Sequence, residues 1–131
     1  MIPVDGAQLV KDWLKTRAAA DHPTLRVVLE VPDGWKLGAA PVLVVADDSG
    51  PMNLWPVATS PQIRVTSWTS GRDRTYAHWA MAQLLGQVIP GVACVLPGTG
   101  VLDARDTKTR ADLASFTVRT RMRTTDRKSV V

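Results

Sequence analysis

The sequence predicts an α+β fold: a mainly antiparallel β-sheet packed by two helices, with a C-terminal β-hairpin. Three observations predict it. Two segments have helical periodicity, strand-like segments occur in runs instead of alternating singly with helices, and the last long segment has a period of two. The chain has 131 residues, 45% of them hydrophobic, which suits a single domain over residues 1–131 with a modest core.

The first helix is predicted over residues 6–20. Asp5 and Gln8 stand three residues apart, as in a capping box, and Pro23 disfavours helical angles at the residue before it. One apolar stripe marks the face expected to pack, and it consists of Leu9, Val10, Trp13, Leu14 and Ala18.

Strands are predicted next, over residues 25–31, 41–46 and 62–68, with 56–58 as a short edge segment. The first two are rich in apolar and β-branched residues and end in turns containing Pro, Asp and Gly. The third alternates, which puts Ile63, Val65 and Ser67 on one side of the sheet.

A second helix is predicted after the segment Ser70-Gly71-Arg72-Asp73, which reads as an N-terminal cap, and before Pro90-Gly91, which stops it. Its apolar positions recur at helical spacing: Tyr76, Ala77, Ala80, Met81, Leu84, Leu85 and Val88. Trp79 and Ala82 widen this arc, so most of the helix circumference is expected to be covered.

The C-terminal part is predicted to contain two short extended pieces, residues 92–96 and 101–104, separated by a turn at 97–100. A polar connection then leads into a long strand at 111–123. One side of that strand is expected to pack: Phe116, Val118, Thr120 and Met122. The other side carries Thr117, Arg119, Arg121 and Arg123.

The net charge of +4 resides entirely in the last fifteen residues, because residues 1–116 contain equal numbers of basic and acidic side chains. The arginine side of the last strand, with the basic tail at about 124–131, is therefore where an acidic partner is expected. Three interpretations are open: a solvated edge strand protected from pairing, an ion-pairing surface in an assembly, or a nucleic-acid contact. The neutral body and the lack of aromatic residues among the arginines disfavour the third.

No catalytic or metal-binding pattern stands out. Cys94 is the single cysteine, which excludes an internal disulfide, and its apolar neighbours predict a buried structural thiol. His22 and His78 lack ligands at metal-binding spacing and are interpreted as structural. The turn at 97–100 lacks the spacing of a phosphate-binding loop. Asp103 and Asp106 flank Arg105 and are expected to form local salt bridges. We therefore expect no enzyme activity, no metal and no cofactor.

Five tryptophans stand beside one Tyr and one Phe. Most are expected in the core, but tryptophans also anchor protein contacts, so Trp35 and Trp55 join Arg119, Arg121 and Arg123 as hypothetical interface residues. The N-terminus lacks a basic and apolar leader, and no run approaches the roughly 20 apolar residues of a membrane span. The sequence thus predicts a soluble protein that does not enter a membrane.

Several segments together resemble the tail terminator, or tail completion, proteins of long-tailed bacteriophages, especially of actinobacterial phages. The similarity covers nearly the whole chain and is a pattern of segments without a catalytic signature. Besides the N-terminal amphipathic helix, it rests on P-V-L-V-V at 41–45, I-R-V-T-S-W-T at 63–69, R-D-R-T-Y-A-H-W-A-M-A-Q-L-L at 72–85, I-P-G-V at 89–92, P-G-T-G-V-L-D-A-R-D at 97–106 and A-D-L-A-S-F-T-V-R-T-R-M-R at 111–123.

The resemblance implies a structural virion protein, made in the host bacterial cytoplasm, that assembles as a homo-oligomer, a hexameric ring, on the head-proximal end of the tail tube. It would stop tube polymerisation there and join the tail to the head connector. The implied partners are the major tail tube protein, the head-side connector or stopper protein and, in the channel, packaged DNA. Two alternatives stay open: another neck or head-completion protein, or a small nucleic-acid-binding protein that acts through its basic C-terminal strand.

Overall fold

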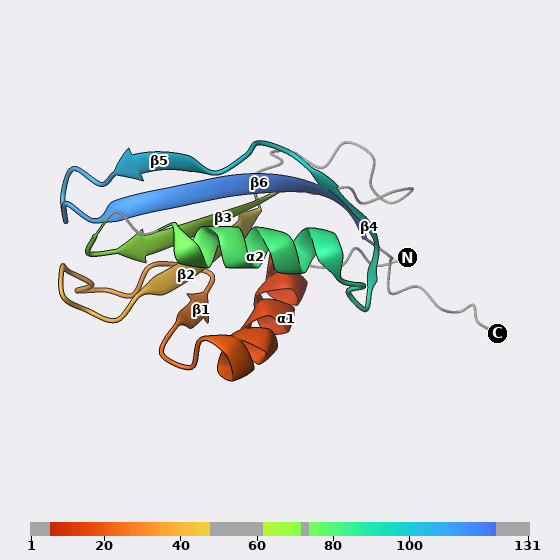
Figure 1. The fold of residues 1–131 in the computed structure, drawn as a ribbon, viewed down its shortest axis with the longest axis horizontal. Coiled ribbons are helices and arrows are strands. Elements are labelled where there is room, and N and C mark those ends of the chain that lie inside the picture. The colour runs from red at the N-terminus through yellow and green to blue at the C-terminus, as the bar shows by residue number, and fades with distance from the viewer. Residues whose placement is uncertain (1–5, 48–61, 72–73, 123–131) are drawn as a thin grey trace.

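The fold is α+β, as predicted, in a computed structural model that describes residues 6–47, 62–71 and 74–122. Two helices and a six-stranded, mostly antiparallel sheet form it (Figure 1). In chain order the elements are α1 (Gly6–Asp21), β1 (Arg26–Val28), β2 (Val42–Asp47), β3 (Gln62–Thr69), α2 (Thr75–Gly86), β4 (Val92–Pro97), β5 (Leu102–Arg105) and β6 (Asp112–Met122).

The sheet has the order β1-β2-β3-β6-β4, and β5 also pairs with β6. β1 is parallel to β2, whereas the other pairs are antiparallel. β5 and β6 form the predicted hairpin around residues 106–111. The long strand β6 therefore pairs with β3 along one side, and with β5 and then β4 along the other.

Both helices lie on the same face of the sheet (Figure 1). The main core fills the space between the helices and the sheet. The alternation in β3 has the predicted effect, because Ile63, Val65 and Ser67 are all buried. In the next strand Phe116 and Val118 lie opposite Val65 and Ile63 and are also buried. The central strands thus turn one apolar face toward the helices.

The two helices are joined to each other by polar and aromatic contacts. The Trp79 indole on α2 donates a hydrogen bond to the Asp21 carboxylate at the end of α1, at 3.0 Å. The ring of His22 packs edge-on against Tyr76 and Trp79, with centroids 5.2 and 5.1 Å away. These contacts fix the two helices relative to each other and give His22 a structural place.

A second, smaller core lies on the opposite face of the sheet under the loop that joins β1 to β2. Trp35 is buried there beside Val42 and Ala111, and its ring meets Trp68 edge-on at 5.8 Å. The Trp35 indole N–H donates a hydrogen bond to the carbonyl of Ala40. This loop therefore packs as part of the fold and covers one end of the outer face.

Three local predictions are wrong. The strand expected over 25–31 forms ladder pairs only over Arg26–Val28, since the chain then bends into the Trp35 loop. Ser70 does not cap α2: that helix starts after Arg74 without a side-chain cap bond, and the Ser70 hydroxyl accepts a hydrogen bond from the Gly38 N–H. Val88 lies beyond the end of α2 and is 91% exposed. The predicted edge segment at 56–58 and the Asp5 cap lie outside the described residues.

Candidate assembly surface

The arginine side of β6 is shorter than the sequence pattern predicts. Arg119 and Arg121 are exposed, but Thr117, the first residue on that side, is only 2% exposed. Arg123 lies outside the described residues. In the described part of the chain, this surface therefore consists of the guanidinium groups of Arg119 and Arg121 alone.

Thr117 is covered because the chain crosses over it between β4 and β5. The Gly98 N–H donates to the Thr117 carbonyl at 3.0 Å, and the Thr99 N–H donates to the Thr117 hydroxyl at 2.9 Å. A Cβ atom on Gly98 would lie 2.7 Å from the Thr117 carbonyl oxygen, closer than real Cβ contacts allow. The predicted turn at 97–100 is thus a glycine-dependent crossing that lets two short strands share one edge of β6.

β4 and β5 form a free edge of which the β4 part is apolar and exposed, whereas β5 carries the charged residues Asp103 and Arg105. Val92–Pro97 contains no charged residue, and along it Ala93, Cys94 and Leu96 are exposed. Leu96 is 50% exposed, and Leu102 at the start of β5 is 56% exposed. Exposed edges are usually protected by charges, because their unpaired N–H and C=O groups invite another strand. β4 has only its bulge between Val92 and Cys94 and its terminal Pro97 as protection.

The arginines lie directly beside this apolar edge. In the ladder between β4 and β6, Leu96 is opposite Arg119 and Cys94 is opposite Arg121. Paired residues on neighbouring strands point to the same face of a sheet. Neither guanidinium has a hydrogen bond or ion pair within the described residues. The surface therefore combines apolar contact area with two positive charges that lack partners.

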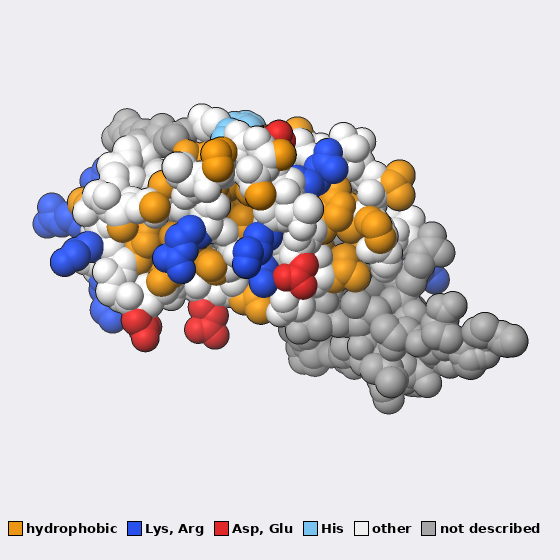
Figure 2. Space-filling view, turned by 90° about the horizontal axis from the view of Figure 1, so that it is seen from below, with side chains coloured by type: hydrophobic (Ala, Val, Ile, Leu, Met, Phe, Trp, Pro, Cys, Tyr) orange, Lys and Arg blue, Asp and Glu red, His pale blue; other side chains and the backbone are white. Residues whose placement is uncertain are grey.

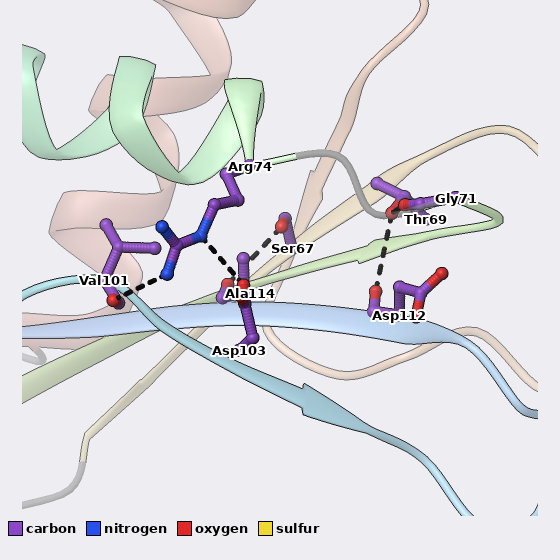
Figure 3. Close-up of polar contacts among 8 residues, drawn as sticks. All are labelled: Ser67, Thr69, Gly71, Arg74, Val101, Asp103, Asp112 and Ala114. Atoms are coloured by element: carbon purple, nitrogen blue, oxygen red, sulfur yellow. Dashed lines mark hydrogen bonds and ion pairs between the residues drawn. The ribbon is translucent and has the colours of Figure 1, made fainter.

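The β5 part of the edge is fixed to the helix layer by Arg74, the residue before α2. Its guanidinium binds the Asp103 carboxylate at 2.8 Å and the Val101 carbonyl at 3.1 Å (Figure 3). Nearby, the Thr69 hydroxyl at the end of β3 reaches the carbonyls of Gly71 and Asp112 (Figure 3). The Arg74 bonds hold β5 at the edge although it has only four residues, and the Thr69 bond to Asp112 joins β3 to the start of β6.

The predicted local salt bridges around Arg105 are wrong in their partners. Asp103 binds Arg74, as described above, and Arg105 binds Asp112 across the hairpin at 3.3 Å. Asp106 instead accepts hydrogen bonds from the backbone N–H and the hydroxyl of Thr109, at 2.8 and 2.7 Å. These bonds lower the pKa of the Asp106 carboxyl, and they close the turn of the hairpin.

One other expectation is also wrong. Cys94 is exposed and not buried, because no described element packs over the outer side of β4. Trp35, offered as an interface residue, is 8% exposed and packs edge-on against Trp68 within the subunit, so its place at an interface stays a prediction. Trp55 lies outside the described residues. The sequence pattern missed the exposed apolar residues Val88, Leu96 and Leu102. For Leu96, the uncharged segment that ends in Pro97 was a hint of an edge strand.

The rest of the described surface also exposes apolar side chains, among them Leu37, Leu85 and Val88. Within residues 6–47, 62–71 and 74–122, no group of three His, Cys, Asp or Glu side chains could hold a metal ion. Seen from below, the α1 side of the molecule intermixes basic, acidic and hydrophobic side chains (Figure 2). Neither of the helices described is long and apolar enough to cross a membrane.

Comparison with known proteins adds no assignment: the sequence matches no model of a protein family and no curated protein.

Proposed function

We propose that this chain is a structural subunit of the tail terminator type. It would assemble on the head-proximal end of a phage tail tube, stop tube polymerisation and join the tail to the head connector. One observation carries the proposal: the uncharged, exposed edge strand β4 lies beside Arg119 and Arg121, which have no partner within the described residues. Such a surface supports a role in contacting other chains, and the segment pattern quoted above resembles tail terminators.

Nucleic-acid binding by a lone subunit is the competing function. It would use the same arginines, since guanidinium groups bind phosphate well. However, the side chains beside Arg119 and Arg121 on β4 are Leu96 and Cys94, not aromatic rings on which bases could stack. An apolar edge next to positive charges suits a protein partner with carboxylates better than a polyanion.

The test is to interrupt the gene in a phage that encodes this chain and to image the lysate. We expect filled heads without tails, together with tubes longer than those of the normal virion. A plasmid copy of the wild-type gene should restore virions, whereas Arg119→Glu/Arg121→Glu should not. A charge-matched control, Lys15→Glu/Lys108→Glu, changes two exposed lysines elsewhere and should restore them.

Two results would overturn the proposal. Normal virions without the gene would show that the chain has no role in tail completion. Tight DNA binding by the purified monomer, falling steeply with salt and lost in Arg119→Glu/Arg121→Glu, would favour the nucleic-acid function.

A further inference from the structure

The outer edge of β4 presents main-chain groups that no described strand pairs with, since among the described strands β4 is bonded to β6 alone. The Gly98 N–H donates to the Thr117 carbonyl, so these two residues form a hydrogen-bonded pair of the ladder. Hydrogen-bonded and non-bonded pairs alternate along an antiparallel ladder. Leu96 and Cys94 therefore also direct their N–H and C=O groups toward β6, whereas those of Val95 point outward.

A groove lies on the helix side of this edge. It has a volume of about 130 Å³ and is formed by the end of α2, the segment after α2, and β4 up to Val95. Two of its apolar lining residues are exposed, Leu85 by 40% and Val88 by 91%. The volume is close to the roughly 150 Å³ of a cavity that holds benzene, so the groove has room for one apolar side chain.

The opposite side of the same edge carries positive charge. Paired residues on neighbouring strands point to the same face of a sheet. Leu96 and Cys94 therefore share the face away from the helices with their partners, Arg119 and Arg121. Val95 is paired with the buried Thr120 and points to the helix side. Along β4 the two parities thus meet different surroundings, one apolar and one cationic.

We propose that β4 binds an extended segment of another protein in which one apolar residue stands between two acidic residues. The segment would add to β4 as an antiparallel strand. The inference goes beyond the proposed function, because it names the chemistry of a partner segment and does not depend on a role in a phage tail.

The register of this addition follows from the groups that Val95 presents. A segment residue opposite Val95 would exchange two main-chain hydrogen bonds with it and direct its side chain to the helix side, toward the groove. Its two neighbours would lie opposite Leu96 and Cys94 and point to the other face. Those positions are level with Arg119 and Arg121, about 10 Å or two strand spacings away. Acidic side chains there can meet the guanidinium groups across β4, and carboxylates bind arginine strongly.

The chain does not contain such a segment itself. No two of its 12 acidic residues are separated by a single residue, so one strand of a second copy could not supply both carboxylates. A nucleic-acid strand would satisfy the arginines, but it would leave the apolar groove and the outward main-chain groups of Val95 without suitable partners. The observations therefore favour a segment of a different protein.

The first test measures the binding of fluorescein-labelled synthetic peptides to the purified chain by fluorescence polarisation. We expect the wild type to bind the peptide S-T-E-I-E-T-S. The peptide S-T-I-E-E-T-S has the same composition but breaks the alternation, and S-T-E-S-E-T-S lacks the apolar residue. Each of these two should bind at least about tenfold more weakly, because specificity in strand addition comes from alternate side chains.

Charge reversal makes the test independent of misfolding. Arg119→Glu/Arg121→Glu should lose binding of S-T-E-I-E-T-S and gain binding of S-T-K-I-K-T-S, and a gain of binding cannot arise from an unfolded chain. The matched control Lys15→Glu/Lys108→Glu changes two exposed lysines elsewhere and should bind both peptides as the wild type does.

Amide hydrogen exchange, followed by NMR, tests the strand addition itself. The outward N–H of Val95 should exchange quickly in the free chain and slowly with S-T-E-I-E-T-S bound. The N–H groups of Leu96 and Cys94 already face β6 and should change little. A contact made by charges alone would leave the exchange of Val95 unchanged.

Several outcomes would overturn the inference. They are no binding of S-T-E-I-E-T-S up to its solubility limit, equal binding of S-T-I-E-E-T-S, no change of peptide preference on charge reversal, and unchanged exchange at Val95. Tighter binding of a single-stranded DNA at the same salt would assign the surface to nucleic acid instead. Self-association of the chain that excludes the peptide would assign it to a second copy. The measurements need only the isolated protein, so a failure here is separate from a failure of the phage complementation test.

Discussion

Gly98 determines whether two short strands can share the edge of β6. Its missing Cβ lets the chain cross Thr117, with the backbone bond at 3.0 Å. We expect Gly98→Ala to lower the free energy of unfolding by roughly 1–3 kcal/mol, the usual cost of forcing extra atoms into a packed site. Urea unfolding would measure it.

Gly100→Ala is the matched control, two residues away. A Cβ there would meet no atom within 4 Å, and the change should alter stability by less than about 0.5 kcal/mol. Equal effects of the two substitutions would contradict the crossing.

Asp106 makes the hairpin turn sensitive to acid. Its pKa is lowered by the Thr109 N–H and hydroxyl, so the folded state binds that proton less readily than the unfolded chain. The resulting stabilisation is present above the ordinary carboxyl pKa, about 3.9, and is lost as the pH falls through the lower folded value. The wild type should therefore lose its stability advantage over Asp106→Asn as the pH falls below the ordinary carboxyl pKa of about 3.9.

Urea unfolding at several pH values checks this prediction. Thr109→Ala removes one donor and keeps the backbone N–H, so it should show a weaker dependence on pH than the wild type. A constant difference between the wild type and Asp106→Asn across that range would mean that the hydrogen bonds in the turn do not hold the carboxylate.

At the scale of the element, α2 approaches the sheet through small side chains. Ala77 and Ala80 are fully buried, whereas Ala82 on the same helix is exposed. Ala80→Leu should therefore cost about 1–3 kcal/mol of unfolding free energy through overpacking. Ala82→Leu has nearly the same helix propensity change without the crowding and should stay within about 0.5 kcal/mol of the wild type. Thermal and urea unfolding of both variants would show the contrast.

The sequence was most informative where local periodicity determines structure. The alternation in β3 and the apolar stripe of α1 follow from side-chain spacing, so both elements were predicted nearly to the residue. The prediction that Cys94 is buried was wrong because burial of an edge strand depends on whether another element covers it. The spacing of apolar residues along β4 does not report this. The prediction for Thr117 was wrong for the opposite reason. Its parity in β6 placed it on the exposed side with the arginines, but the turn at Gly98, far away in the sequence, covers it.

The same limit applies to the candidate site. Arg119 and Arg121 were predicted to be exposed from their parity in β6, and they are. Their apolar neighbour Leu96 became visible only through strand pairing. Site residues contributed by different strands need the topology before they can be grouped.

At the scale of the whole molecule, the proposed contact has an ionic part and an apolar part, and salt separates them. Exposed charge pairs are screened as the Debye length falls from about 10 Å at 0.1 M to about 3 Å at 1 M, whereas burial of apolar surface does not weaken in this way. The fraction of the peptide S-T-E-I-E-T-S bound by the wild type should therefore fall as sodium chloride rises, measured by fluorescence polarisation at fixed protein concentration.

Two variants divide the contact into these parts. Arg119→Gln/Arg121→Gln should bind the peptide more weakly at low salt and respond less to added salt, because the charges on one side of the contact are gone. Leu96→Ser keeps both arginines and should weaken binding while retaining the wild-type salt response, since this 50% exposed side chain supplies apolar area. If both variants responded to salt as the wild type does, the arginines beside β4 would not form the ionic part of the contact.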